Sequence, residues 1–336
     1  MAAKENLEQY LSRRGVSRRA FLKFCAVTSS ALALPAQKAA LFAASLAASP
    51  RPAVIWLSGQ ECTGCSESLL RSYEPTVETL ILGHLSLDYH NTLMAPAGVY
   101  AEASRDAVLL DGTIPYVVVI DGSIPLNDNG FWSAIGGRSA LDVIAEAVAG
   151  AVLVLAVGNC SAYGGLAAAR PNPSGALGVD GLMQRGLTAT RPLINIPGCP
   201  PNPEVLTGTI AHFLAFGTVP ELDDRLRPKV YYGKTVHDCC SRIDHFKNER
   251  FALAFDDEGA RQGYCLALLG CRGMTTRNAC SSLKWNQGTS YPMYSGHGCI
   301  GCSEPGFWDK GDLYRDEGAL PDPDGLCVAP PIPPIR

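Results

Sequence analysis

Cysteines are the residues of this chain with the clearest capacity for chemistry, and there are 13 of them. Cys62 and Cys65 stand in "GQECTGCSESLL", directly after the apolar run "PAVIWLS". A Cys-x-x-Cys pair can begin a zinc ribbon, a redox dithiol, a disulfide or an iron-sulfur site. Cys160 in "VGNC" and Cys199 in "PGCPP" also follow apolar runs. Four thiolates at one site suit either zinc or a 4Fe-4S cluster.

The elements that must position these thiols are strand-like runs separated by helix-length segments. The expected strands are apolar and β-branched, and they span residues 53–58, 85–89, 116–122, 151–158 and 192–198. Helical spacing occupies residues 66–82, 140–150 and 203–216. This alternation predicts a flavodoxin-like, doubly wound α/β domain with a parallel sheet, although the strand order cannot be read from the pattern. Cofactors of such sheets sit beyond the carboxyl ends of the strands, where all four thiols fall.

Glycines accompany these cysteines in "TGC", "VGNC" and "PGCPP". A glycine lets backbone amides approach the sulfur atoms of a cluster, an approach from which zinc would gain little. The pattern therefore favours an iron-sulfur cluster. The competing interpretation is a set of buried free cysteines with one incidental pair.

The composition changes after about residue 220. Apolar runs become rare, while Gly, Cys and aromatic residues become frequent, as in a small domain organised around metal. Its candidate ligands stand in "VHDCC", "YCLALLGC", "NAC" and "GHGCIGC". We expect a flavodoxin-like domain at residues 48–220, a small and largely irregular iron-sulfur domain at 221–311, and a proline-rich tail at 312–336.

The N-terminus has the pattern of an export signal. "SRRAFLKFCAVTSSALALPA" places Arg18 and Arg19 ahead of a weakly apolar stretch, which is typical of a twin-arginine signal peptide over residues 1–47. The apolar stretch is shorter than the roughly 20 residues that a membrane span needs. Seven of the chain's Lys and Arg residues lie in this segment, so the remainder is acidic and disfavours nucleic acid as a partner.

Together with this leader, "ECTGCSESLL", "GNCSAYGG", "PGCPPNP" and "GCIGCSEPGFWDKG" give the chain its family resemblance. The chain resembles the small subunit of exported nickel-iron hydrogenases over roughly residues 53–311. Several ligand blocks at the family's spacing make the resemblance specific. The leader and the last 25 residues lie outside it.

The resemblance implies three clusters, each with its own ligands. A proximal 4Fe-4S cluster would be held by Cys62, Cys65, Cys160 and Cys199. A distal 4Fe-4S cluster would be held by His237, Cys240, Cys265 and Cys271. A medial 3Fe-4S cluster would be held by Cys280, Cys299 and Cys302. Cys25, Cys239 and Cys327 are left over; Cys239 could compete with its neighbour Cys240 for iron.

The function implied by the resemblance is electron transfer inside a hydrogenase. The chain would pass single electrons between its clusters, while a partner, the large subunit, would contain the nickel-iron centre that splits H2 into protons and electrons. No catalytic residue is expected in this chain. Glu61 beside Cys62 is a candidate for proton transfer, although a solvated or hydrogen-bonded carboxylate is the simpler interpretation.

The resemblance also implies a location and an acceptor class. We expect a periplasmic protein, exported in folded form and associated with the membrane through a partner, which donates electrons to a membrane-bound or periplasmic acceptor. Two alternatives compete with this interpretation. One is an exported zinc or disulfide scaffold, and the other is the cluster subunit of a related quinone reductase, which carries adjacent cysteines in its first motif and lacks the second domain.

Oxygen-tolerant members of the family place two further cysteines around the proximal cluster. In this chain the corresponding positions are Gly64 and Gly165. The resemblance therefore implies a standard proximal cluster and an oxygen-sensitive hydrogenase.

Overall fold

A five-stranded parallel sheet is the central element of the first of two structural units. The computed structural model describes residues 52–73, 76–77 and 85–310, together with several residues between 25 and 41. Within the chain, contacts divide Met1–Val230 from Tyr231–Arg336, and each unit is described by itself. Most of the expected signal peptide and the whole of the tail from residue 312 lie outside the described residues.

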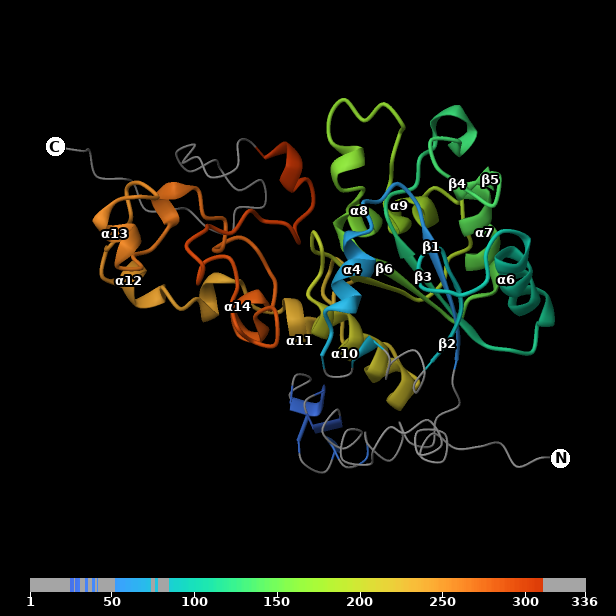
Figure 1. The fold of residues 1–336 in the computed structure, drawn as a ribbon, viewed down its shortest axis with the longest axis horizontal. Coiled ribbons are helices and arrows are strands. Elements are labelled where there is room, and N and C mark those ends of the chain that lie inside the picture. The colour runs from blue at the N-terminus through green and yellow to red at the C-terminus, as the bar shows by residue number, and fades with distance from the viewer. Residues whose placement is uncertain are drawn as a thin grey trace. The chain divides into compact units, whose positions relative to one another are not determined.

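The sheet has the strand order β2-β1-β3-β6-β7. All four pairings are parallel. This order is the one found in flavodoxin-like folds, so the predicted fold class is confirmed. The strands are β1 (Ala53–Ser58), β2 (Ser86–His90), β3 (Tyr116–Asp121), β6 (Leu153–Val157) and β7 (Leu193–Ile196). Each lies within two residues of its expected bounds (Figure 1).

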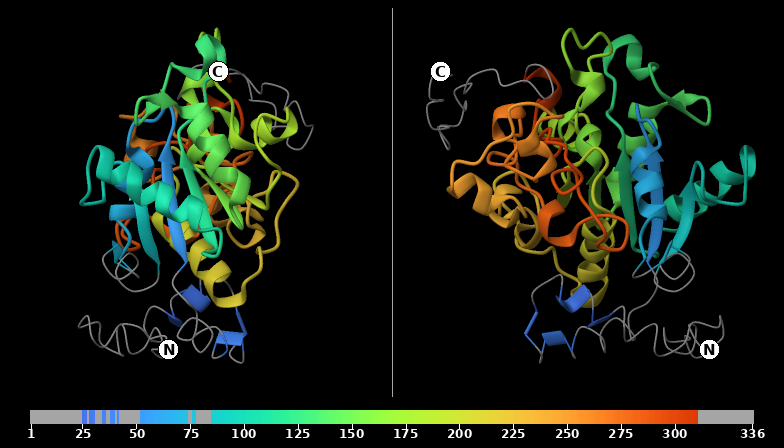
Figure 2. Two further views of the ribbon diagram at one scale, coloured as in Figure 1. Left: turned by 90° about the vertical axis from the view of Figure 1, so that its right-hand side faces the viewer. Right: turned by 60° about the vertical axis from the view of Figure 1, so that its left-hand side comes forward.

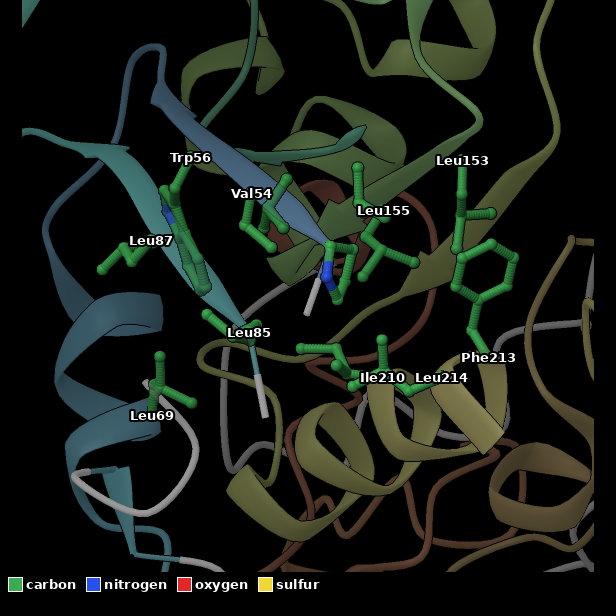
Figure 3. A pocket seen from close by; sticks show the side chains of 13 residues that line it. Val54, Trp56, Leu69, Leu85, Leu87, Leu153, Leu155, Ile210, Phe213 and Leu214 are labelled. Carbon is green, nitrogen blue, oxygen red and sulfur yellow. The ribbon is translucent and has the colours of Figure 1, made fainter. Parts of the chain in front are cut away.

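Helices cover both faces of the sheet, as a buried parallel sheet requires. Ile55 and Leu57 point to one face, where they share a core with residues of α6 (Val99–Asp111), α7 (Ala140–Gly150) and α9 (Val179–Gln184). Val54 and Trp56 point to the other face, opposite α4 (Gly64–Leu70) and α10 (Pro203–Phe216). Figure 3 shows this second, wholly apolar lining, with Ile210, Phe213 and Leu214 of α10 beneath the strands.

Local capping explains why two helices have their expected bounds. Ser139 precedes α7, and its hydroxyl accepts a hydrogen bond from the backbone N–H of Asp142. Asn202 caps α10 in the same way, Pro203 occupies the first turn, and Gly217 ends the helix in a left-handed conformation.

The sequence pattern did not predict α6, α9, the short α8 (Gly158–Tyr163) or the two-stranded hairpin of β4 (Ala134–Ile135) and β5 (Arg138–Ser139). The described part of this unit also contains the 3₁₀ turns η2 (Asn127–Gly130) and η3 (Leu166–Ala168).

The two units divide at residue 230, ten residues after the boundary expected from composition. The intervening segment is tied to β7, because the backbone N–H and the side-chain amide of Asn195 donate to the carbonyls of Leu226 and Arg225. A buried ion pair between Arg227 and Asp223 (2.8 Å) closes the turn. Polar contacts of this kind leave no trace in the apolar pattern from which the boundary was inferred.

The second unit has little regular structure, as expected. Its α-helices are α11 (Lys229–Tyr232), which crosses the division, α12 (Ile243–Lys247), α13 (Glu258–Arg261) and α14 (Cys280–Leu283). Its 3₁₀ turns are η4 (His237–Cys239), η5 (Ala267–Leu269) and η6 (Phe307–Asp309). Figure 2 shows these short orange and red helices joined by long loops. Among the described residues, no helix is long and apolar enough to span a membrane.

Candidate metal centres

The first group of thiols lies at the carboxyl edge of the sheet, as predicted. Cys62 and Cys65 follow β1, Cys160 lies in α8 after β6, and Cys199 follows β7. Two hydrogen bonds join these segments. The Ser68 hydroxyl of α4 donates to the Pro201 carbonyl (2.6 Å), and the Asn159 N–H donates to the Gly198 carbonyl (2.8 Å). The loops that carry the four cysteines are therefore held to one another.

Electrostatics shows that the four thiols share one environment. Burial raises the pKa of Cys65 well above its usual value, and the charges of Asp121, Cys160, Cys199 and Cys62 raise it further. The pKa of Cys199 is raised to about 11 by burial and then by Cys160 and Cys62. Cys62 and Cys199 are exposed, whereas Cys65 and Cys160 are partly covered. Bound iron would reverse this preference for the neutral thiol, because a metal-coordinating thiol is deprotonated.

Two glycines let the backbone pass close to these sulfur atoms. Gly158 has a φ of 88°, and a side chain there would bring a Cβ within 2.4 Å of Cys65 Sγ. At Gly165, whose φ and ψ are 54° and −145°, a Cβ would lie 2.4 Å from Cys160 Sγ. Gly158 thus permits the close backbone approach that its position in "VGNC" indicated, and Gly165 makes a similar approach although it lies outside the three motifs.

A buried hydrogen-bond chain beside this site had no counterpart among the sequence predictions. Ser66, next to Cys65, donates to Asp121 Oδ2 (3.3 Å) and contacts His90 Nε2 (3.3 Å). The backbone N–H groups of Thr92 and Leu93 donate to His90 Nδ1, which assigns the proton to Nε2. Burial lowers the pKa of His90 to about 4, so the ring is neutral. Asp121 ends β3 at the same sheet edge as the thiols, and that position was its only signal in the sequence.

The second group lies in the second unit and lines one pocket. His237, Cys240, Cys265 and Cys271 surround it together with Arg242 and Met293. Burial raises the pKa of Cys265 to about 11, and the charges of Cys271 and Cys240 add to this effect. Burial lowers the pKa of His237, which favours the neutral imidazole that binds metals. The structure therefore brings together the four residues predicted for the distal site.

The third group is centred on Cys299. Burial raises the pKa of Cys280 and of Cys299 to about 12, and the charge of Cys299 contributes to the shift at Cys280. Cys302 and Cys271 contribute to the shift at Cys299. The backbone N–H of Cys299 also donates to Cys271 Sγ (3.2 Å). The second and third groups are thus in direct contact through one hydrogen bond.

Each group offers a donor set that fits an iron-sulfur cluster. Thiols, with one neutral imidazole in the second group, converge at each site, and in the second and third groups backbone N–H groups point at the sulfur atoms of Cys240, Cys271 and Cys299. Within the described residues, no three His, Cys, Asp or Glu side chains are close enough to hold a single metal ion.

Comparisons with known proteins identify the family. The uptake hydrogenase small subunit of Azotobacter vinelandii is 43% identical over 321 residues, which cover 96% of this chain and 88% of that protein. The hydrogenase-1 small chain of Escherichia coli K12 is 41% identical, with coverage of 94% and 83%. The chain belongs to the NiFe hydrogenase small subunits. It is therefore part of an oxidoreductase whose catalytic centre lies in the large subunit, and the resemblance found in the sequence is confirmed.

A solved structure supports the same assignment. The reduced, active Ni-Fe-Se hydrogenase from Desulfomicrobium baculatum aligns with a TM-score of 0.73 at 32% identity, covering 79% of this small subunit and 99% of that chain. Residues 232–315 match the family model for the C-terminal part of NiFe/NiFeSe hydrogenase small subunits. Residues 62–213 match the family of the 20 kD subunit of NADH ubiquinone oxidoreductase. The similarity to a quinone-reductase subunit is thus limited to residues of the first unit. Membership of the hydrogenase family implies iron-sulfur clusters in this protein.

The remaining candidates differ in their surroundings. Cys239 is exposed at the end of η4, Cys25 is buried in the N-terminal segment, and Cys327 lies outside the described residues. Glu61 Oε1 accepts a hydrogen bond from the Thr63 hydroxyl (3.4 Å). Glu61 Oε2 is buried and has no hydrogen-bond partner within the described part of the chain. Burial and the charge of Asp121 raise the pKa of Glu61. Proton transfer by Glu61 stays a prediction.

Proposed function

We propose that this small subunit relays single electrons through three clusters between the nickel-iron site of the large subunit and an acceptor, in a hydrogenase that oxidises H2 reversibly. The observation that supports it most directly is the gathering of the predicted ligands into three groups. An iron-sulfur cluster, when bound, takes up and releases one electron at a time. The surrounding groups of the chain hold and shield the clusters.

We assign one iron-sulfur cluster to each of the three ligand groups. The proximal 4Fe-4S cluster would be held by the four thiols of the first unit, and the distal 4Fe-4S cluster by His237 with three thiols. The medial 3Fe-4S cluster would be held by Cys280, Cys299 and Cys302. Burial of Cys299 excludes water from the medial site and keeps donors such as the Gly301 N–H, 3.4 Å from Cys299 Sγ, directed at the ligands.

The large subunit is the partner proposed for the surface around the proximal thiols. Of the four proximal thiols, Cys62 and Cys199 are exposed. Leu166 of η3, six residues after Cys160, is 58% exposed. A cluster that exchanges electrons with a buried catalytic centre requires an obligate contact, for which an interface above about 2,000 Å² is typical. The heterodimer agrees with the family assignment.

The location and the acceptor are also proposals. Export in folded form by the twin-arginine route would place the heterodimer in the periplasm, with association to the membrane through a partner. Electrons would leave at the distal cluster for a membrane-bound or periplasmic acceptor. Half-buried His237 is the distal ligand expected nearest the surface.

The test is purification of the tagged chain from its native periplasm and membrane. A second chain that carries nickel should copurify, and the complex should reduce a dye with H2. It should be brown, absorb broadly near about 400 nm and contain roughly eleven iron atoms per small subunit beyond the nickel-iron centre. A colourless protein that contains zinc or disulfides and no iron would overturn the proposal in favour of the scaffold.

The medial site gives a prediction that involves one residue. Pro292 stands in the segment where relatives with a medial 4Fe-4S cluster supply a fourth thiolate, and proline cannot bind iron. Its neighbours Tyr291 and Met293 pack with Cys299. We expect oxidised protein to show the paramagnetic signal of a 3Fe-4S cluster, and Pro292→Cys to convert that signal to a 4Fe-4S one. An intact unmodified protein with only 4Fe-4S signals would contradict the assignment.

The proximal site gives a prediction for oxygen. With four thiols at the site and glycine at positions 64 and 165, the proximal cluster should cycle between two redox states. H2 oxidation should then decay when the enzyme turns over under a few per cent oxygen, roughly, because no further oxidation of this cluster supplies electrons to the attacked centre. A redox titration followed by electron paramagnetic resonance (EPR) should find one reversible proximal transition. Sustained turnover in oxygen, or a second transition, would show the opposite.

A further inference from the structure

Tyr291 connects the two thiol groups of the second unit. It stands in the segment between Cys280 and Cys299, and the residue is 3% exposed in an apolar cluster with Val236, Met293 and Cys299. Its hydroxyl, however, reaches the other thiol group of this unit and lies 3.7 Å from Sγ of Cys240. The contact joins residues that are 51 positions apart, so the spacing of the motifs gave no sign of it.

Tyr291 Oη accepts one hydrogen bond and shares a second with the Ser241 hydroxyl, in which either oxygen can be the donor. The backbone N–H of Ser241 donates to Tyr291 Oη (2.7 Å), and the Ser241 hydroxyl lies 2.9 Å away. When the serine hydroxyl donates as well, both lone pairs of the phenol oxygen are used and its own hydrogen is left to be donated. Cys240 Sγ is the acceptor within reach.

Cys240 then accepts two hydrogen bonds on one sulfur. The second comes from the backbone N–H of Arg242, at 3.4 Å. Hydrogen bonds to a cluster thiolate stabilise the more negative, reduced form, and they therefore raise the reduction potential. Because the tyrosine ring is buried, little water is available to replace the hydroxyl if it is removed.

We propose that Tyr291 is a positioning residue for the distal site, whose hydroxyl donates to the Cys240 thiolate and raises the reduction potential of the distal cluster relative to the medial one. The inference rests on the cluster assignment proposed above. It gives Tyr291 an influence on the distribution of electrons between two neighbouring centres.

The test is a potentiometric titration of the intact heterodimer with Tyr291→Phe, which keeps the ring and removes only the hydroxyl. The distal cluster is recognised by the ¹⁴N coupling of its imidazole ligand in pulsed EPR. At the potential where half of the unmodified distal cluster is reduced, the reduced-to-oxidised ratio should fall about threefold to tenfold. The upper value corresponds to about 59 mV for a one-electron couple. The proximal and medial potentials should stay unchanged.

Two variants serve as controls. Tyr294→Phe makes the same chemical change on the exposed tyrosine that stacks on Tyr291 at 6.3 Å, and it should leave every potential unchanged. Ser241→Ala keeps the backbone donor and removes the serine hydroxyl, so it should also leave the distal potential near its original value.

Several results would overturn the inference. They are an unchanged distal potential in Tyr291→Phe, an equal shift of all clusters, or loss of the distal cluster in Tyr291→Phe while Tyr294→Phe retains it. Absence of any imidazole-coupled cluster in the unmodified complex would instead reject the underlying cluster assignment, and the inference with it.

Discussion

The Cys240→Ala variant should lose the distal 4Fe-4S cluster, whereas Cys239→Ala should retain it. Cys240 lines the same pocket as His237, Cys265 and Cys271, and its charge contributes to the raised pKa of both of these cysteines. Its sulfur also accepts hydrogen bonds from the Arg242 N–H and the Tyr291 hydroxyl. Cys239 is exposed at the end of η4. With about three residues per turn, adjacent side chains of a 3₁₀ turn leave the backbone roughly 120° apart, so the two neighbouring thiols face different directions.

The measurement is iron content and EPR of the purified heterodimer. Cys240→Ala should lose about a third of the small subunit's iron and the imidazole-coupled signal, and electron delivery to an external dye should fall by at least about tenfold. Cys239→Ala is the matched control, because it removes the same group one residue earlier. If Cys239→Ala loses the cluster and Cys240→Ala keeps it, the pattern His-x-x-Cys has been assigned to the wrong thiol.

The sheet was predictable from the sequence because its strands are buried on both faces. Continuous apolar, β-branched runs located β1, β3 and β6 to within two residues, and helical spacing located α7 and α10. By contrast, α6 was missed. It contains the buried Arg105, which pairs with Glu102 and Asp106, and a charged residue on its buried face weakens the helical pattern.

The three ligand groups were predicted from the sequence on different grounds. Cysteines at strand ends indicate a common site by physical argument alone, because parallel strands end at one edge. Membership of the distal and medial groups came from the family resemblance, since loops without regular structure impose no such geometry. Asp121, His90 and Tyr291 were missed for a related reason. Each acts through a side-chain contact with a residue distant in the sequence, and a single Asp, His or Tyr carries no spacing signal.

Gly165→Ala should have the second large effect, the loss of the proximal cluster. The backbone at Gly165 has a φ of 54° and a ψ of −145°, a combination that residues with a side chain rarely adopt. A Cβ there would also lie 2.4 Å from Cys160 Sγ and 2.7 Å from Cys160 Cα. The chain must shift to relieve this contact, and the shift would move a proximal ligand away from the other three thiols.

The control for Gly165→Ala separates backbone strain from crowding of the ligand. Gly186 also has a positive φ, 68°, but a Cβ there would have no atom within 4 Å. Gly186→Ala should therefore cost only the conformational strain, about 1–2 kcal/mol, and should keep all clusters. Gly165→Ala should lose the proximal EPR signal and lower H2 oxidation by at least about tenfold, since its added methyl group displaces Cys160. Equal iron content and activity in the two variants would mean that the turn at residue 165 adapts to a side chain.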